Sequence, residues 1–372
     1  MYQPHFAYTH DIVKTLMRIE HYCTSMFYLK LPSLERQKML YTAKVKRTHF
    51  STSIEGNTLS YDQVERTIQK KAEDCSLNAE REVINYWDAM NYLDAQHKKH
   101  TPISEDFIKT LHGYITKAGK RVITSSYREA TPPGVLFAVY DSVTRTPAYI
   151  PPEYVDVGPL MTDLVSWYAT DQKTPEPIKA AIFLYQFVTI HPFSDGNGRT
   201  ARALATYILM ETGYDMKGCQ SMEEYYASDL QGYYGNLQMG LPALYYNGRI
   251  NPPHLEQWIG YFLNIMALNS EKIYLAAQSV SIKNKPKDLI VILNIQELKL
   301  VRYILETQKT EVTTKELSEL FHVSTKTISR WCKRWCERGV LSPNTANIRT
   351  TSYSLAPEYA NISLSDLGYV DM

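Results

Sequence analysis

The sequence predicts a mainly α-helical protein with one small β-hairpin and a small separate domain towards the C-terminal end. Apolar residues recur at helical spacing over most of the first 280 residues. Residues 119–155 differ, because they are rich in Pro, Gly and β-branched residues. The polar, basic stretch SIKNKPKD (281–288) then precedes a helix-turn-helix pattern. We therefore expect an N-terminal helical region over 1–100, a core over 101–280 and a C-terminal domain over 286–372.

The composition is that of a globular protein, and the sequence indicates neither a polycationic chain nor a membrane-spanning protein. The 372 residues carry a formal net charge of +1, so the chain is no polycation and would bind nucleic acid only through a local basic patch. Five Cys, with no CxxC pair and no zinc-binding spacing, suit a reducing compartment. The first residues lack a basic segment followed by an apolar one, and no apolar run is long enough to cross a membrane. We therefore expect a cytoplasmic protein without a membrane partner.

Local start and stop signals divide the N-terminal part into helices. Ser60 and Ser104 stand where N-cap residues belong, and Gly56 followed by Asn57 is a C-terminal stop signal. The expected helices in this part are 11–30, 34–57, 60–74, 79–98 and 104–117.

The hairpin is expected where VLFAVY (135–140) and PAYI (147–150) flank the polar DSVTRT (141–146). The helices expected after it are 157–171, 176–190, 196–212, 221–239 and 254–280. In the C-terminal domain we expect one helix or two over 289–309, helices over 313–321 and 325–339, and a short hairpin over 346–355.

The stretch HPFSDGNGRTAR (191–202) interrupts two apolar helices with polar chemistry. Gly196, Asn197 and Gly198 form a tight turn that opens a helix, and bare N–H groups at a helix N-terminus bind anions. Arg199 and Arg202 lie on one face of the first turns, where they oppose the helix dipole unless a polyanion such as a polyphosphate binds there.

The same stretch holds a metal ligand and a base. Asp195 is suited to hold a Mg²⁺ that bridges phosphate oxygens. His191 could accept a proton from an attacking hydroxyl, and Phe193 would anchor the loop in the core. No GxxxxGK[ST] sequence and no HRD/DFG set occurs, which excludes a P-loop protein and a protein kinase. A solvated, capped helix start is the remaining alternative, and the concentration of functional residue types speaks against it.

The stretch resembles the motif of the Fic-domain family, HPFx[D/E]GNGRxxR, with every defining position filled. The resemblance extends over roughly residues 40–270 and implies a Fic helical core with a β-hairpin flap. It implies a protein adenylyltransferase that uses ATP and Mg²⁺, modifies a Tyr, Thr or Ser hydroxyl, releases pyrophosphate and also modifies itself. The implied roles are catalytic base for His191, Mg²⁺ ligand for Asp195, anion hole for Gly196, Asn197 and Gly198, and phosphate clamps for Arg199 and Arg202.

A second motif resembles the inhibitory helix of class II members, [ST]xxxE[GN]. STSIEG (51–56) supplies Ser51 and Glu55 at the end of an expected inhibitory helix at about 40–57. The resemblance implies that Glu55 reaches Arg202 and blocks the productive γ-phosphate pose, since a carboxylate competes with phosphate for one guanidinium. The alternative for Glu55 is a solvated residue near a helix C-cap.

The hairpin and a later segment resemble two further Fic elements. The hairpin resembles the flap, whose edge would align a target segment by strand addition. The candidate flap contacts, for nucleotide and target alike, are Gly134, Val135, Leu136, Phe137 and Ala138. GYYGNL (232–237) resembles the family's YYxxL segment, which implies that Tyr233 and Tyr234 lie near adenine and ribose. Asn247 and Trp258 are further candidates for a contact with the adenine.

The C-terminal domain resembles a winged helix-turn-helix. Its second helix presents Lys326, Arg330, Lys333 and Arg334, with Ile328, Trp331 and Trp335 as expected core residues. DNA recognition would place this helix in the major groove. The alternative is a module for packing or for binding another protein.

Three functions follow from the sequence. The first is an autoinhibited protein adenylyltransferase. The second is a Fic-type de-AMPylase or another nucleotidyl or phosphoryl transferase. The third is a DNA-binding regulator in which the Fic core senses a nucleotide without turnover. The sequence leaves the formation of a homodimer open.

Overall fold

The computed structural model describes residues 2–70, 77–119, 121–140, 146–243, 252, 254–283, 293–346, 349–359, 362–364 and 367. The chain divides into two compact units. The first comprises Met1–Leu29 and Arg36–Ala276, and the second comprises Lys30–Glu35 and Ala277–Met372. The mainly helical fold with a small hairpin is confirmed, while the three-part division at 1–100, 101–280 and 286–372 stays a prediction. Among the described residues, no helix is long and apolar enough to cross a membrane.

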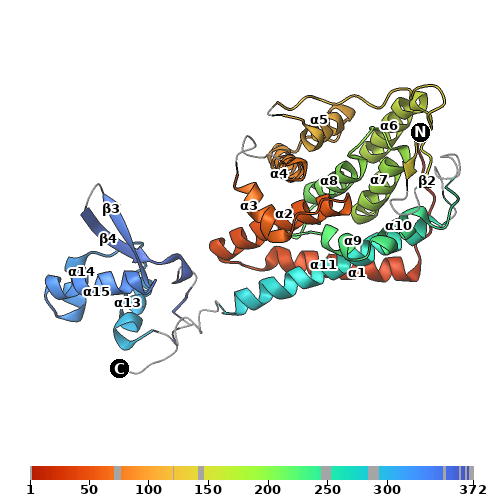
Figure 1. Ribbon diagram of the computed structural model, residues 1–372. Coiled ribbons are helices and arrows are strands. Elements are labelled where there is room, and N and C mark those ends of the chain that lie inside the picture. The colour runs from red at the N-terminus through yellow and green to blue at the C-terminus, as the bar shows by residue number, and fades with distance from the viewer. Residues whose placement is uncertain are drawn as a thin grey trace. The chain divides into compact units, whose positions relative to one another are not determined.

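The N-terminal helices lie close to their predicted ranges (Figure 1). They are α1 (His10–Tyr28), α2 (Ser33–Ile54), α3 (Tyr61–Ile68), α4 (Asn78–His97) and α5 (Glu105–Thr116). Ser60 caps α3 and Ser104 caps α5, as predicted from their positions. Helix α3 ends before the predicted residue 74, and residues 71–76 lie outside the described part.

A Schellman motif ends α2 at the predicted stop signal. The N–H of Asn57 donates to the Thr52 carbonyl at 3.1 Å, and that of Gly56 donates to the Ser53 carbonyl at 2.9 Å. Gly56 has φ +94°, a backbone conformation that residues with a Cβ atom rarely adopt. Glu55 is therefore held at a defined point, just beyond the last turn of the helix.

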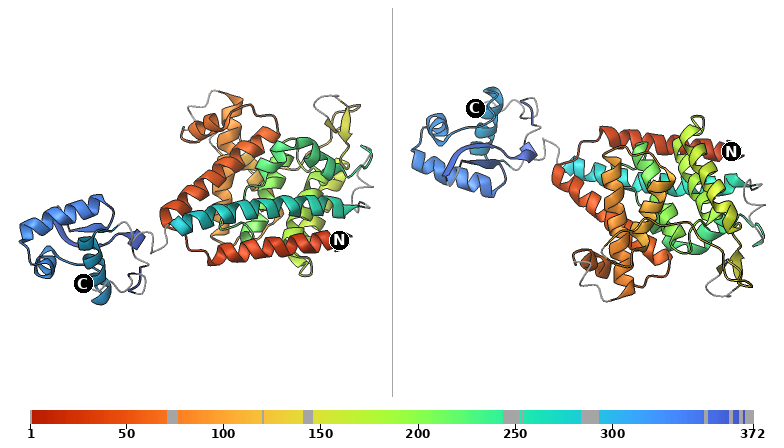
Figure 2. Two further views of the ribbon diagram at one scale, coloured as in Figure 1. Left: turned by 90° about the horizontal axis from the view of Figure 1, so that it is seen from below. Right: turned by 90° about the horizontal axis from the view of Figure 1, so that it is seen from above.

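Two nearly fully buried helices form the centre of the first unit (Figure 2). They are α7 (Glu176–Ile190) and α8 (Asn197–Glu211), packed against each other in the same core cluster. Helix α6 (Tyr154–Thr170) packs on α7, while α4 and α5 pack on α8. Helices that are buried all round belong to the centre of a domain. The loop between α7 and α8 is thus held at both ends by helices buried in the core.

The predicted helix over 221–239 is wrong, because the chain forms two short helices there. They are α9 (Glu223–Ser228) and α10 (Leu230–Gln238). Asp229 separates them with a non-helical backbone (φ −140°, ψ 71°), and its side chain accepts a 2.9 Å hydrogen bond from the N–H of Gly232. An Asp at this place starts a new helix in preference to continuing the old one.

The long helix α11 (Leu255–Lys283) follows and lies beside α1. The two are joined by an ion pair of Arg18 with Glu271 at 3.0 Å. Helix α11 reaches Lys283, so the predicted linker start at 281 is wrong by three residues.

The hairpin is shorter than predicted. Strand β1 (Val139–Tyr140) pairs with β2 (Pro147–Tyr149) in antiparallel register, and the predicted turn at 141–145 lies outside the described residues. The strand does not begin at Val135 because the chain turns first. The N–H of Val135 donates to the Pro132 carbonyl at 3.0 Å, and Gly134 has φ +82°.

The second unit contains helices and a hairpin in the predicted order. Its elements are α13 (Ile295–Glu306), α14 (Thr314–Phe321), α15 (Thr325–Glu337), β3 (Leu341–Ala346), β4 (Arg349–Leu355) and the 3₁₀ turn η3 (Pro357–Tyr359). The hairpin begins at 341, earlier than the predicted 346. Ile328 and Trp335 are buried in its core and Trp331 packs against it. The assignment as a winged helix-turn-helix stays a prediction.

Candidate functional site

Two left-handed backbone conformations shape the loop between α7 and α8. His191 ends α7 with φ +52°, and Gly196 precedes α8 with φ +75°. Between them, the Asn197 side chain bridges the loop: its Oδ1 accepts from the N–H of Phe193 at 2.9 Å and its Nδ2 donates to the Phe193 carbonyl at 2.7 Å. The Phe193 ring is buried, as predicted. The amide of Asn197 therefore braces the loop, which leaves only its backbone N–H to face a ligand.

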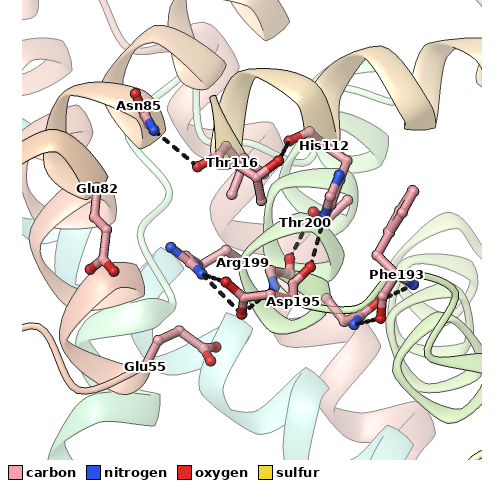
Figure 3. A network of polar contacts seen from close by, with 12 residues as sticks. Glu55, Glu82, Asn85, His112, Thr116, Phe193, Asp195, Arg199 and Thr200 are labelled. Atoms are coloured by element: carbon pink, nitrogen blue, oxygen red, sulfur yellow. Dashed lines mark hydrogen bonds and ion pairs between the residues drawn. The ribbon is translucent and has the colours of Figure 1, made fainter. Parts of the chain in front are cut away.

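His112, which no sequence motif indicated, supports the loop from α5 (Figure 3). Its ring stacks on Phe193 with 3.7 Å between the ring centroids, its Nε2 lies 2.8 Å from the Asp195 carbonyl, and its Nδ1 lies 2.6 Å from Ser125 Oγ. Burial lowers the pKa of His112, so the ring is neutral and its Nε2–H donates to the carbonyl. The sequence gives only a weak indication of this role, since a single polar residue on the apolar face of an amphipathic helix can serve several purposes.

Asp195 and Arg199 form an ion pair at the solvent-facing edge of the loop. Arg199 Nη2 lies 3.2 Å from Asp195 Oδ2, and Asp195 Oδ1 accepts a hydrogen bond from the N–H of Gly196 at 2.6 Å. The Asp195 side chain is 82% exposed, whereas Arg199 is buried. An exposed carboxylate next to a helix N-terminus fits a Mg²⁺ that takes its other ligands from phosphate and water.

Arg202 is buried, and its guanidinium donates hydrogen bonds to residues at and just beyond the end of α2. Its Nε donates to Ser51 Oγ at 3.0 Å, and its Nη2 donates to the Ser51 carbonyl and to Glu55 Oε1, both at 2.8 Å. The Glu55 carboxylate outweighs the cost of burial and raises the pKa of Arg202. The structure thus brings together Ser51, Glu55 and Arg202, residues from two motifs far apart in the sequence.

The Glu55 carboxylate also lies over the N-terminus of α8. A Cβ atom added to Gly198 would lie 2.3 Å from Glu55 Oε1 and 3.1 Å from Arg202 Nη1. The carboxylate is therefore in close contact with the first turn of α8, which is where bare N–H groups attract an anion. Glycine at 198 is required for this approach.

A cleft of about 610 Å³ opens beside these residues. This volume is in the range that small-molecule ligands occupy in proteins. It is lined by Ser53, Ile54, Glu55, Gly56, Val139, Tyr140, Ala148, Tyr149, Val188, Thr189, His191, Gly198, Arg202, Leu230, Tyr233, Tyr234, Leu237 and Gln238. The candidate base, the candidate inhibitory carboxylate and one candidate phosphate clamp therefore share one cavity.

The His191 ring is oriented for proton acceptance. Its Nδ1 lies 3.2 Å from the Val188 carbonyl, and because a carbonyl only accepts, Nδ1 carries the proton and Nε2 keeps its lone pair. Burial, and then the charge of Arg128, lower the pKa of His191 to about 4. The imidazole is thus neutral at physiological pH, as a general base must be.

Arg128, also missed in the sequence, connects this base to the flap. Its Nε donates to the His191 carbonyl at 2.9 Å, and its Nη2 donates to the Pro152 carbonyl. Its guanidinium lies 4.5 Å from the centroid of the Phe137 ring, which is itself 6.0 Å from the His191 ring. Nothing in the pattern SSYREATPP distinguishes this arginine from a surface residue.

Comparison with known proteins agrees with this geometry. Residues 102–209 match the Fic/DOC family. This part of the chain is therefore similar to Fic domains. The protein adenylyltransferase fic-1 of Caenorhabditis briggsae is 29% identical over 254 residues, which cover 64% of this chain and 46% of the relative. Its namesake in Caenorhabditis elegans is 31% identical over 221 residues, 57% of this chain and 40% of the relative. The chain spans less than half the length of these two curated relatives.

Solved structures share the fold. A Fic family protein from Desulfovibrio desulfuricans aligns over 95% of this chain and 98% of its own with a TM-score of 0.60 at 19% identity. Residues 134–508 of Fic-1 from C. elegans align over 74% of both chains with a TM-score of 0.56 at 25% identity.

The predicted flap contacts do not line the cleft, and their contacts with nucleotide and target stay a prediction. Gly134, Val135, Leu136, Phe137 and Ala138 lie before β1, and none is among the residues that line the cleft. The cleft is lined instead by residues of the paired strands, because the turn after Pro132 directs Val135 and Leu136 into solvent. Phe137 alone approaches the site, through its contact with Arg128.

The two predicted tyrosines of α10 have different environments. Tyr234 is 43% exposed, whereas Tyr233 is 1% exposed and packs on Tyr226 with 4.6 Å between ring centroids. Tyr233 is therefore mainly a core residue with an edge in the cleft. Trp258 does not line the cleft, because it is buried and its Nε1 donates to the Ala181 carbonyl at 2.7 Å. Asn247 lies outside the described residues.

Replacing Gly198 should separate Glu55 from Arg202. A methyl group at Gly198→Ala would collide with Glu55 Oε1, so we expect a lower melting temperature in thermal denaturation. In a Glu55→Gly background the same methyl group should lower the free energy of unfolding only slightly. A double-mutant cycle should therefore give a coupling free energy of about 1 kcal/mol or more. Gly260→Ala, where nothing lies within 4 Å, is the control. Additive effects of the two substitutions would contradict the contact.

The pKa of His191 can be measured directly by NMR titration of the imidazole. We expect about 4, and a higher value in Arg128→Met that stays below 6.5, since burial is the larger cause. Because the unfolded chain binds this proton at higher pH than the folded one, His191 supports stability fully above pH 6.5. That contribution declines as the pH falls towards 4. A His191 pKa at its ordinary value of 6.5 would refute the assignment of this residue as a buried, neutral base.

Proposed function

We propose that this chain is a protein adenylyltransferase that its own Glu55 holds inactive. The proposed reaction moves AMP from ATP to a Tyr, Thr or Ser hydroxyl of a protein, including this chain itself, and releases pyrophosphate. One observation carries the proposal: the Glu55–Arg202 ion pair lies at the N-terminus of α8, in the same cleft as a neutral His191. The names of the C. briggsae and C. elegans relatives support the reaction class.

In the proposed reaction the residues of the loop accept one proton from the target hydroxyl and stabilise the negative charge of the phosphates. Nε2 of His191 takes the proton of the target hydroxyl, whose oxygen then forms a bond to the α-phosphorus of ATP. The bond from that phosphorus to the oxygen bridging to the β-phosphate breaks, and pyrophosphate leaves. The N–H groups of Gly196, Asn197 and Gly198, with Arg199, stabilise the charge on the phosphates.

Asp195 is the proposed Mg²⁺ ligand. When bound, the ion would neutralise phosphate charge and orient the leaving group. Its carboxylate is exposed and is paired only weakly with Arg199, at 3.2 Å, so the pair can open to admit the ion and free Arg199 for phosphate.

The inhibition follows from a competition for one guanidinium. Arg202 donates to Glu55 at 2.8 Å, and a γ-phosphate would need the same donor. The carboxylate also lies against Gly198, so it adds a negative charge beside the site where the phosphates would bind. ATP can therefore bind only in a displaced pose until Glu55 moves.

Removing the carboxylate should activate the enzyme. Incubated with α-labelled ATP and Mg²⁺, Glu55→Gly should label protein at least about tenfold faster than wild type, since a charge-assisted hydrogen bond is lost. Glu55→Gln, which keeps the length but not the charge, should have an intermediate effect.

Adding His191→Ala to Glu55→Gly should abolish labelling, and Asp62→Ala, on the exposed start of α3, should resemble wild type. No label on any protein with Glu55→Gly would overturn the proposal. Release of AMP from a labelled protein would indicate a de-AMPylase instead, and competition by other nucleotides would identify a different donor.

A second candidate function is DNA binding by the second unit through α15. Lys326, Arg330, Lys333 and Arg334 are all exposed on one face of α15, opposite the buried Ile328, Cys332 and Trp335. Within the described part of the chain none of these four cations pairs with a carboxylate. An uncompensated basic stripe on a helix suits a phosphate backbone.

The salt dependence of a gel shift tests this function on the full chain. Double substitution of Arg330 and Lys333 by Ala should weaken binding of duplex DNA. It should also reduce the slope of log K against log salt by about one per phosphate contact removed. Lys315→Ala, on the exposed side of α14, is the control and should change little. No binding by wild type at low salt would remove this function.

A further inference from the structure

A cluster of metal-ligating side chains lies at the far end of α8, away from the Fic motif. It consists of His97, the last residue of α4, His100 in the turn that follows, and Glu211, the last residue of α8. The 15 residues of α8 span about 22 Å, so this cluster is remote from the candidate active site at the other end of the helix.

The ligand atoms of the cluster converge on one point. His97 Nδ1 lies 2.6 Å from Glu211 Oε1, His100 Nδ1 lies 3.3 Å from Glu211 Oε2, and all three groups lie within 4.8 Å of one another. Ligands of a tetrahedral Zn²⁺ at about 2.0–2.1 Å are about 3.3 Å apart. Small side-chain movements would therefore bring these three atoms to coordination distance.

The backbone holds the histidines in this arrangement. His100 has φ +49°, and the N–H of Thr101 donates to the Gln96 carbonyl at 3.2 Å, so the chain turns back at the end of α4. The Thr101 carbonyl accepts a 2.6 Å hydrogen bond from the Tyr207 hydroxyl of α8. The turn is thus tied to the helix that carries Glu211, which limits the freedom of the cluster.

The electrostatic surroundings favour a cation. Two helices end here, and each presents the negative end of its dipole. The Glu211 carboxylate adds a full negative charge in the last turn of α8, a position that the dipole disfavours and a cation would stabilise. The half-buried Asp215 also interacts electrostatically with His97.

We propose that His97, His100 and Glu211 form a site for Zn²⁺ that joins the C-terminal ends of α4 and α8. Two imidazoles and one carboxylate form a ligand set that suits zinc, whereas Mg²⁺ prefers oxygen ligands alone. Three protein ligands leave room for water, and His100, whose side chain is 77% exposed, leaves a path for entry. The ion would anchor the far end of the helix whose first turn carries the Fic motif.

The test is a calorimetric titration of the metal-free full chain with Zn²⁺ in millimolar Mg²⁺. Thermal denaturation with and without Zn²⁺ is measured on the same protein. One equivalent should bind and raise the melting temperature, since the ion stabilises only the folded chain. His100→Ala and Glu211→Gln should each weaken binding by at least about tenfold. Co²⁺ should give the intense visible absorption of a tetrahedral site in wild type and lose it in His100→Ala.

His10→Ala, an exposed histidine at the start of α1, is the matched control and should bind zinc as wild type does. Three results would overturn the site. The first is no uptake of zinc by wild type. The second is equal affinity of wild type and His100→Ala, which would leave the cluster as a hydrogen-bonded clamp. The third is zinc that is retained in His100→Ala and lost in Asp195→Ala, which would locate the ion at the Fic motif.

Discussion

The buried guanidinium of Arg202 is the constraint on which the rest of the first unit depends. A cation in the core must have hydrogen-bond acceptors. An unpaired buried charge destabilises the folded chain by far more free energy than a buried ion pair adds to its stability. Ser51 and Glu55 provide them from the end of α2. Helix α2 is therefore bound to α8 by the same contacts that are proposed to inhibit the enzyme. The proposed inhibition and the packing of α2 on α8 therefore depend on one interaction.

This arrangement explains why the end of α2 is so well defined. The Schellman motif at Gly56 ends the helix at Ile54 and places the Glu55 carboxylate against Gly198 and Arg202. A carboxylate on a flexible segment would lose entropy on binding and would compete poorly with ATP. A carboxylate held at a rigid helix end needs no such ordering. Anything that releases Glu55 must shift the end of α2 or exchange the anion.

The base and the flap form a second linked system. Arg128 bonds the backbone of His191, contacts the Pro152 carbonyl and lies over Phe137. Its charge also helps to keep His191 unprotonated. His112 supports the opposite side of the same loop through Phe193 and the Asp195 carbonyl. Neither residue belongs to a motif, because each acts through backbone contacts that many sequences could provide.

The sequence alone was enough to predict features that depend on nearby residues. Helix caps at Ser60 and Ser104, the stop at Gly56 and the tight turn before α8 follow from residue types at short spacing. Tertiary structure decided which distant groups meet. Tyr233, for example, turns inward to the core. Two other departures from the prediction are local, since Asp229 caps α10 and divides a predicted helix, and the chain turns at Gly134 before β1. Packing brings Glu55 onto Arg202 and His97 onto Glu211, contacts that local propensity cannot specify because their free energy exists only in the folded core.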